Sequence, residues 1–372
     1  MEVVKEQVTQ EVGSNQDEIK CKGCGASLVY KPGTINLLCQ FCGAENPIET
    51  ATTEIKENDF YAVLENLGTI SVKQTITLVK CTGCAAEVTF EPNISSEDCP
   101  FCGAHIVTED KTTVDVLQPE ALLAFNIDSA KAYELFKKWI NGLWWAPNDL
   151  KKYAIQKDKL AGIYMPFWTY DADTISAYSG QRGEFYTESY TVTINGKSQT
   201  QTRTKTRWYP AGGTVSVPFD DTLVRGSNSL PVKLLEKLEP WDLPNLTPYD
   251  NKYLSGFRTE KYQIELKEGF VMAKDKMKPI IETAIKSDIG GDTQRIFSVN
   301  TDYNNISFKH ILLPVWVSSY LYNKKTFNFM INARTSEVQG DRPYSWIKIT
   351  LAVLAVVAVG LVAYYIYQDY QQ

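Results

Sequence analysis

The placement of the cysteines constrains the fold of this chain more than any other feature. All eight lie between residues 21 and 102 of the 372, and they form four C-x-x-C pairs. Segments 20–44 and 80–104 align without a gap, 60 residues apart. Two matched sets of four cysteines are typical of metal sites and indicate thiols in a reducing compartment.

We therefore expect two four-cysteine zinc ribbons. The ligands are Cys21, Cys24, Cys39 and Cys42 in the first ribbon, and Cys81, Cys84, Cys99 and Cys102 in the second. The 14 residues between the two pairs of each set suit a short hairpin that closes the site. Four thiolates then hold one Zn²⁺ at about 2.3 Å. Ribbons of about 30 residues bury too little apolar surface to fold without metal.

Disulfides, a thioredoxin-like redox pair and an iron–sulfur site are the alternatives, and the matched spacing favours structural zinc. Gly25, Gly43 and Gly103 follow knuckle cysteines, where a positive φ turns backbone N–H groups toward sulfur. Ala85 occupies the same position in the third knuckle and should strain it slightly. His105 lies near a set that already has four sulfurs, so we expect it to be a bystander.

The C-terminus predicts a single transmembrane helix over residues 346–368. Residues 349–367 carry no charge and span about 28 Å as a helix, which matches the hydrocarbon core. Trp346 at one end and three tyrosines at the other fit an aromatic belt. A buried helix of a soluble protein is the alternative. Arg342 and Lys348 flank the N-terminal side of the uncharged stretch and no cation follows it, so the bulk of the chain should be cytoplasmic and the C-terminus outside.

The remaining sequence predicts an α+β domain with an antiparallel sheet. Helices are expected at 128–142, with Asp128 as N-cap, at 231–240 and at 264–287. Asn195–Gly196 is a strong signal for a two-residue hairpin turn. Ile163-x-x-Pro166-x-Trp168 reappears as Ile311-x-x-Pro314-x-Trp316, either by chance or as a duplicated strand.

The chain should thus be multi-domain, with seven segments. These are a flexible segment (1–17), ribbon 1 (18–48), a linker with a short helix at 57–68 (49–78), ribbon 2 (79–108), the α+β domain (109–345), the transmembrane helix (346–368) and a short tail (369–372).

Charge argues against nucleic-acid binding by the ribbons. Residues 20–110 hold six lysines, no arginine and twelve acids, a net charge of −6. An acidic surface repels phosphates. Val29, Tyr30, Phe41, Val88, Phe90 and Phe101 can either leave apolar patches for protein partners or pack around the metal.

Arg203, Lys205 and Arg207 alternate along a predicted strand and should share one face. A charged edge strand is the favoured interpretation, and contact with anionic headgroups or an acidic partner is the sharper one. Gly196-Lys197-Ser198 resembles only the end of a P-loop, and Asp220–Asp221 is expected in a turn after Pro218. We find no catalytic motif and expect a non-enzyme.

The combined pattern resembles a bacterial family of membrane-anchored proteins with duplicated TFIIB-type zinc ribbons, often labelled primosomal helicase-like. The resemblance rests on the two ribbons and on segments 161–183, 311–322 and 341–349. It implies an association with membrane-stress systems that contain phage-shock-type and band-7 (SPFH) proteins. We expect a tail-anchored scaffold that binds two zinc ions, the bilayer and cytoplasmic proteins. A membrane-tethered nucleic-acid-binding protein and an uncatalogued enzyme are the alternatives.

Overall fold

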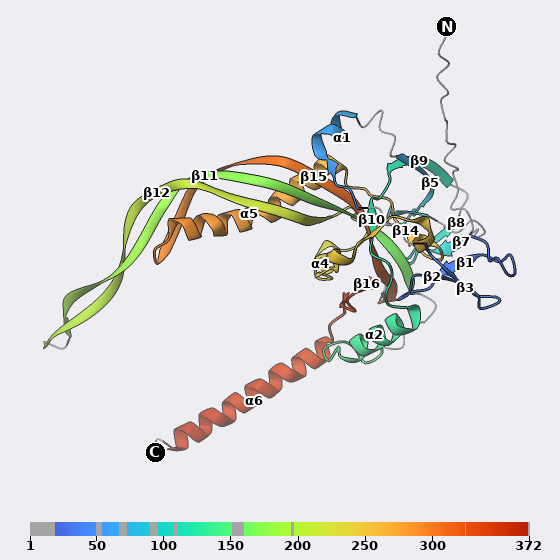
Figure 1. Ribbon diagram of the computed structural model, residues 1–372. Helices are drawn as coiled ribbons and strands as arrows, with labels where there is room; N and C mark the ends of the chain where they lie inside the picture. Colours follow the sequence, from blue (N-terminus) through green and yellow to red (C-terminus); the bar gives the residue numbers. More distant parts are fainter. Residues whose placement is uncertain are drawn as a thin grey trace, which may run out of the picture.

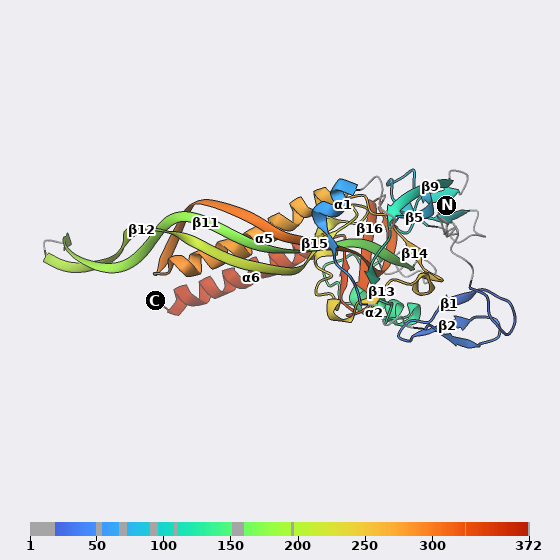
Figure 2. The same cartoon turned by 45° about the horizontal axis from the view of Figure 1, so that its top comes forward.

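The computed structural model describes residues 19–49, 54–66, 73–89, 96–107, 111–150, 160–194, 197–323 and 325–370. A body of short strands and helices carries two long projections, a curved β-arm and the C-terminal helix α6 (Figure 1). Both projections leave the body on one side, and the first cysteine unit lies on the opposite side (Figure 2).

Three very long strands form the arm. They are β11 (Ala161–Ile194, 34 residues), β12 (Lys197–Arg225, 29 residues) and β15 (Thr293–Tyr322, 30 residues). At about 3.3 Å per residue, β11 alone extends roughly 110 Å, whereas ordinary strands have about 3–10 residues. β11 and β12 pair antiparallel as far as Ile194 and Lys197, so the predicted hairpin is confirmed on both sides of its turn. Residues 195 and 196 of that turn lie outside the described part.

Helix α5 (Leu266–Ile289) lies along the arm and supports it (Figure 1). Its buried residues recur every three or four positions, from Leu266 through Met277 to Ile289, which is the spacing of one helix face. The Tyr178 hydroxyl of β11 donates to Asp288 Oδ2 at 2.6 Å near the end of the helix. The expected helix at 264–287 is therefore confirmed within two residues at each end.

Shorter strands complete the sheet, whose main path runs β12-β11-β15-β10-β13. These strands are β4 (Asn58–Asp59), β10 (Ala121–Leu122), β13 (Thr247–Pro248), β14 (Arg258–Thr259), β16 (Lys325–Asn332) and β17 (Val338–Gly340). The long pairings are antiparallel, as predicted. Two short pairings, β10 with β15 and β14 with β11, are parallel and were not expected.

The repeated I-x-x-P-x-W motif lies at the centre of this sheet. β11 and β15 run antiparallel with Ile163 opposite Val315 and Phe167 opposite Ile311, so the two copies lie side by side. The Trp168 indole N–H donates to the carbonyl of Ile264 at 2.9 Å. The Trp316 indole N–H donates likewise to Ile127 at 2.8 Å. The motif is therefore a structural repeat rather than a chance similarity.

The repeat extends to a whole unit. Ile127 and Ile264 each lie two residues before a helix, α2 (Ser129–Asn141) and α5 respectively. The amide of Ile127 donates to Ala333 O at 3.1 Å, and that of Ile264 donates to Gly226 O at 3.0 Å. The body thus contains two βαββ halves, β10-α2-β11-β12 and β14-α5-β15-β16. Each half packs the residues that lead into its helix against the long strand of the other half.

The remaining helices lie close to where the sequence predicts them. Helix α2 has Asp128 as N-cap, whose carboxylate accepts from the amide of Lys131 at 2.7 Å. Helix α1 (Phe60–Asn66) lies within the segment expected to form a short helix. Helix α4 (Val232–Glu236) is shorter than expected, and the 3-10 helices η2 (Leu243–Asn245) and η3 (Asn251–Leu254) follow it.

The two cysteine units are built from short antiparallel strands. The first contains β1 (Leu28–Tyr30), β2 (Asn36–Cys39) and β3 (Glu45–Pro47) in one sheet. The second contains β6 (Glu87–Val88), β7 (Ser96–Asp98) and β8 (His105–Val107). It is flanked by β5 (Lys73–Lys80) and β9 (Lys111–Leu117), which pair with each other. Strand β5 begins inside the segment predicted as a linker, for which the sequence predicts only a short helix.

Helix α6 (Trp346–Tyr370) extends away from the body (Figure 1). None of its described residues is buried, and its apolar side chains face outward along its whole length. It is long and apolar enough to cross a membrane.

Candidate metal centres

The structure brings the four cysteines of the first unit together. The Cys21 and Cys42 sulfurs are 3.6 Å apart, and those of Cys24 and Cys39 are 3.5 Å apart. Cys21 and Cys24 lie on the turn before β1, and Cys39 ends β2. The hairpin therefore places the second C-x-x-C pair opposite the first, as the spacing predicted.

The second unit repeats this arrangement. The Cys81 and Cys102 sulfurs are 3.6 Å apart, and those of Cys84 and Cys99 are 3.7 Å apart. In each unit all four sulfurs lie within 4.8 Å of one another. The eight candidate ligands therefore form the two sets that the sequence predicted.

The geometry can be compared with that of a bound ion. Four sulfurs placed about 2.3 Å from the centre of a tetrahedron lie roughly 3.8 Å from each other. The measured separations of 3.5 to 3.7 Å are close to this value. A disulfide would need about 2.05 Å between sulfurs, and the structure shows all eight cysteines free. Both clusters can hold a metal ion, and a closed four-sulfur set is consistent with zinc.

Each knuckle uses the same backbone turn. The amides of Gly25, Gly43, Ala85 and Gly103 donate to the carbonyl of the first cysteine of their knuckle at 2.8–2.9 Å. All four residues have positive φ, including Ala85 at 61°. The amides of Gly23 and Gly83 donate to the first sulfur of their knuckles, at 3.4 and 3.3 Å. The positive φ that the sequence predicted after the knuckle cysteines is thus confirmed at the three glycines, and Ala85 shares it.

Backbone and neighbouring thiols favour an anion in each cluster. The amide of Cys42 lowers the pKa of Cys39 to about 6. Contact with Cys99 lowers the pKa of Cys84 to about 5. Because a metal binds the thiolate and not the thiol, the lowered pKa values of Cys39 and Cys84 favour metal binding at each cluster.

His105 stays outside the second cluster, as expected. Its side chain is exposed, and its Nδ1 lies 3.3 Å from Asp98 Oδ1. It is not a member of the second sulfur set, which is complete with Cys81, Cys84, Cys99 and Cys102.

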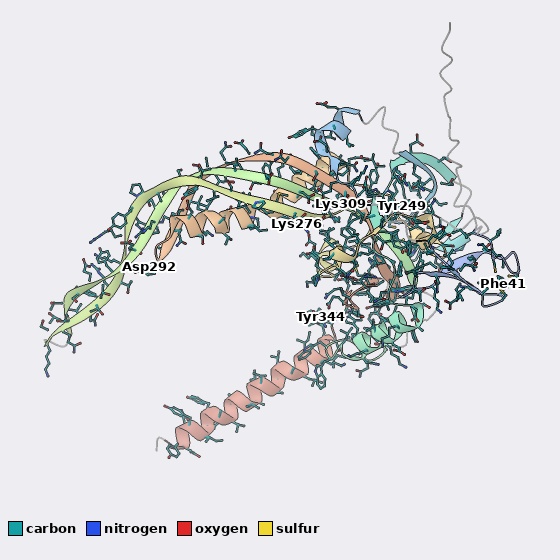
Figure 3. All side chains as sticks on the ribbon, in the orientation of Figure 1. Phe41, Tyr249, Lys276, Asp292, Lys309 and Tyr344 are labelled. Carbon is teal, nitrogen blue, oxygen red and sulfur yellow. The ribbon has the colours of Figure 1, made fainter. Side chains whose placement is uncertain are left out.

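The apolar residues of the two units differ in their exposure to solvent. Tyr30, Val88 and Phe101 are buried, so packing, and not a surface patch, explains them. Val29 is half-buried. Phe41 is exposed on the first unit, at the end of the molecule far from α6 (Figure 3). Phe90 lies outside the described residues.

An acidic cluster where the arm meets the body was missed by the sequence reasoning. Oxygens of Glu57, Asp171 and Asp220 lie within 4.8 Å of one another. Asp220 and Asp221 belong to β12, so the turn expected there is wrong. Lys309 lies at this junction (Figure 3). Its ammonium is 2.8 Å from both Glu57 and Asp221. Because the Lys309 ammonium pairs with Glu57, and the Ser307 hydroxyl is within hydrogen-bond distance of both Glu57 and Asp171, we interpret the cluster as a network of ion pairs and hydrogen bonds.

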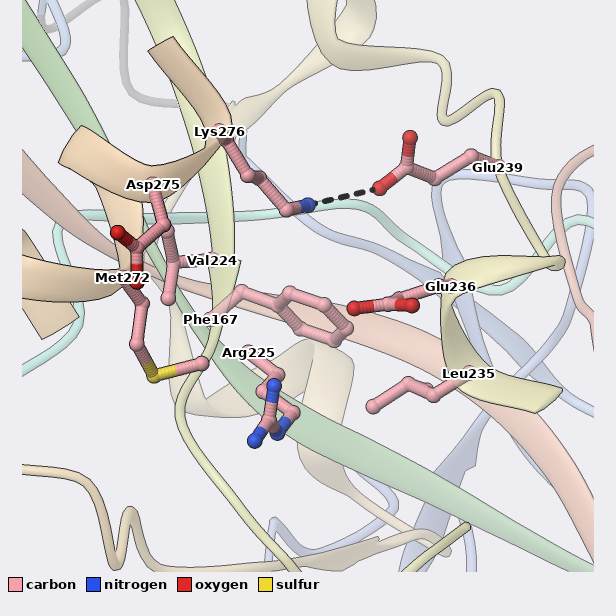
Figure 4. A pocket seen from close by; sticks show the side chains of 9 residues that line it. All are labelled: Phe167, Val224, Arg225, Leu235, Glu236, Glu239, Met272, Asp275 and Lys276. Atoms are coloured by element: carbon pink, nitrogen blue, oxygen red, sulfur yellow. Dashed lines mark hydrogen bonds and ion pairs between the residues drawn. The ribbon is translucent and has the colours of Figure 1, made fainter. Parts of the chain in front are cut away.

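A small cavity of about 240 Å³ lies between α4, α5 and the base of β12 (Figure 4). Glu236, Glu239 and Asp275 face it together with Arg225 and Lys276. The Lys276 ammonium lies 3.3 Å from Glu239 and donates to Leu223 O at 2.8 Å. The contacts of Lys276 thus tie α5 to β12 and to the segment after α4, which is typical of a structural contact between elements.

The cation stripe is placed as predicted. Arg203, Lys205 and Arg207 alternate on β12, the outer strand of the sheet. Glu188 of β11 pairs with Arg203 and with Lys205, both at 2.6 Å. The Arg207 guanidinium lies 5.0 Å from the centre of the Tyr186 ring. These pairings fit the interpretation as a charged edge strand.

Over 330 residues the chain is 26% identical to uncharacterized protein YdjG of Bacillus subtilis (strain 168). The match covers 88% of this chain and 90% of that protein. No family model and no solved structure matches the chain.

Proposed function

We propose that the chain is a membrane-anchored zinc protein that presents its ribbons and body to cytoplasmic protein partners as a scaffold. The observation that carries this proposal is the uncovered knuckle of the first unit. Phe41 is 83% exposed there, beside the exposed Cys42. A large aromatic side chain held in water on a rigid metal knuckle is well suited to anchor a protein interface.

Zinc is the metal that we assign to both clusters. Closed sites of four thiolates are typical structural zinc sites, and the sulfur separations fit a tetrahedron of that size. The ion would supply no reaction there, because it has no open position for a substrate. This agrees with a non-catalytic role.

Helix α6 supplies the membrane anchor in this proposal. Arg342 and Lys348 lie at its N-terminal end. The positive-inside bias then leaves the body in the cytoplasm. Figure 1 shows the arm arching from the body, with its tip descending toward the level at which α6 begins. A bilayer below both would contain a tilted α6 and leave the charged arm in water.

The partner class comes from the family resemblance and from charge. The resemblance points to phage-shock-type and SPFH proteins at stressed membranes. The ribbon segment, with a net charge of −6 over residues 20–110, disfavours nucleic acid as an alternative partner.

Capture of partners from detergent-solubilised membranes tests the scaffold role. The full-length protein and its Phe41→Ser variant are purified side by side, with Tyr61→Ser as a control at another exposed aromatic residue. We expect the same partner set with the wild type and with Tyr61→Ser, and a clear loss of partners with Phe41→Ser. Equal recovery by all three proteins would contradict docking at the knuckle. Salt-sensitive binding of the full-length protein to DNA or RNA would favour the tethered nucleic-acid-binding alternative.

A further inference from the structure

The turn that follows α2 exposes two adjacent tryptophans. Trp144 is 77% exposed and Trp145 is 40% exposed, although tryptophan is usually one of the more buried residues. The turn lies beside the base of α6, where Tyr344 is labelled in Figure 3.

Hydrogen bonds hold this turn to the start of α6. The amide of Ser345 donates to Trp145 O at 2.7 Å. The Lys348 ammonium donates to Trp144 O at 3.0 Å and to Ala146 O at 2.7 Å. Because Ser345 and Lys348 flank the first residue of α6, the tryptophans stay beside the start of the helix whatever its tilt.

An apolar groove of about 640 Å³ separates the turn from the helix. Leu143 and Leu150 line it on the body side, and Leu351 and Ala352 line it on the side of α6. Lys348 also faces the groove. An apolar channel with a cation beside it matches the shape of a phospholipid, which has an acyl chain and an anionic phosphate.

We propose that the turn 143–148 is a second membrane contact, with Trp144 and Trp145 seated among the lipid headgroups and a phospholipid acyl chain in the groove. Tryptophan is enriched at the membrane interface, because its ring is apolar and its N–H is polar. Trp346, which is also exposed, belongs to the same aromatic belt. The contact is continuous with the anchor and rests on the proposed role of α6 as a membrane helix. The two contacts together fix how the body lies on the bilayer.

Photochemical labelling of the full-length protein tests this proposal. The protein is reconstituted in liposomes that contain a phospholipid with a photoactivatable acyl chain, and cross-linked peptides are mapped by mass spectrometry. We expect cross-links in 346–370 and also in 143–150, with none in the peptide that contains Phe41. Cross-links confined to 346–370 would overturn the second contact and leave the anchor intact. Cross-links in neither segment would overturn both, and equal labelling at Phe41 would overturn the specific contact.

Variants separate lipid contact from a structural role of the turn. Trp144→Ser should reduce labelling of 143–150 several-fold while labelling of 346–370 stays unchanged. Phe41→Ser, at a comparably exposed aromatic residue, should change neither. If Trp144→Ser leaves labelling of the turn unchanged, the proposed lipid contact is wrong. The same labelling in native membranes would also contradict it if a protein partner protects the turn there.

Discussion

The two cysteine units share sequence and backbone geometry but differ in how the body uses them. The sequences of residues 39–44 and 99–104 differ only in the residue after the first cysteine. The phenylalanine that they share is exposed to solvent in one unit and buried in the other. Phe41 is 83% exposed, whereas Phe101 is 2% exposed. The second cysteine of each knuckle is exposed in the first unit (Cys24 and Cys42) and half-buried in the second (Cys84 and Cys102).

The difference arises from the faces that meet the body. The first unit docks through its hairpin, where the amide of Tyr30 donates to Ser255 O at 2.9 Å. Its second knuckle is left in solvent. The second unit inserts its second knuckle into a core that contains Leu123, Ile163 and Val315. The second knuckle of the second unit has thus become part of the core, whereas its counterpart in the first unit leaves Phe41 in solvent.

Loss of one metal ion should have the largest effect on stability, and this effect should differ most between the two units. Cys42→Ser and Cys102→Ser each remove one ligand and should lower the bound zinc from two ions to one. Structural zinc contributes about 10–16 kcal/mol to the folding of a ribbon. Because the second knuckle carries Phe101 into the core, Cys102→Ser should also unfold part of the body, whereas Cys42→Ser should not. Metal analysis and thermal unfolding of the two variants decide this, and equal melting temperatures would break the comparison.

The two phenylalanines provide the next test. Phe101→Ala removes a buried ring and should lower the free energy of unfolding by about 3–5 kcal/mol. Phe41→Ala removes a ring from water and should change it by no more than about 0.5 kcal/mol. Denaturant unfolding of both variants with zinc bound measures the difference. A large loss for Phe41→Ala would mean that the first knuckle is covered by another part of the chain.

The sequence could predict what is determined locally. The spacing of the cysteines identified both sulfur sets because each knuckle needs only six residues. The charge-free stretch before Gln368 likewise identified α6, and Asp128 marked the start of α2. In each case a short segment contains all the information that fixes its structure.

The sequence could not show what depends on distant partners. The aromatic and β-branched residues of segment 161–180 indicate a strand, but the 34-residue length of β11 depends on β15 and α5. The buried state of Phe101 depends in the same way on a core formed by residues far along the chain. The paired Trp168 and Trp316 motifs were visible as an echo, but only the register of β11 against β15 shows that they form two halves of one body.

The smallest expected effect is also the sharpest test, because it should have opposite signs in the two units. Ala85 has a φ of 61°, a region in which a side chain other than glycine costs roughly 1 kcal/mol. Ala85→Gly should therefore tighten metal binding at the second cluster by a few-fold. Gly25 occupies the equivalent position with a φ of 74°, and an added Cβ there would meet nothing within 4 Å. Gly25→Ala should thus weaken the first cluster by a similar factor through backbone strain alone. Competition with a chelator measures both changes. The Cys42→Ser background isolates the second cluster for Ala85→Gly, and the Cys102→Ser background isolates the first cluster for Gly25→Ala. If both substitutions weaken metal binding, contacts of the Ala85 methyl group stabilise the second cluster by more than its backbone strain costs. The knuckles of Gly25 and Ala85 would then differ in energy although their backbone hydrogen bonds are the same.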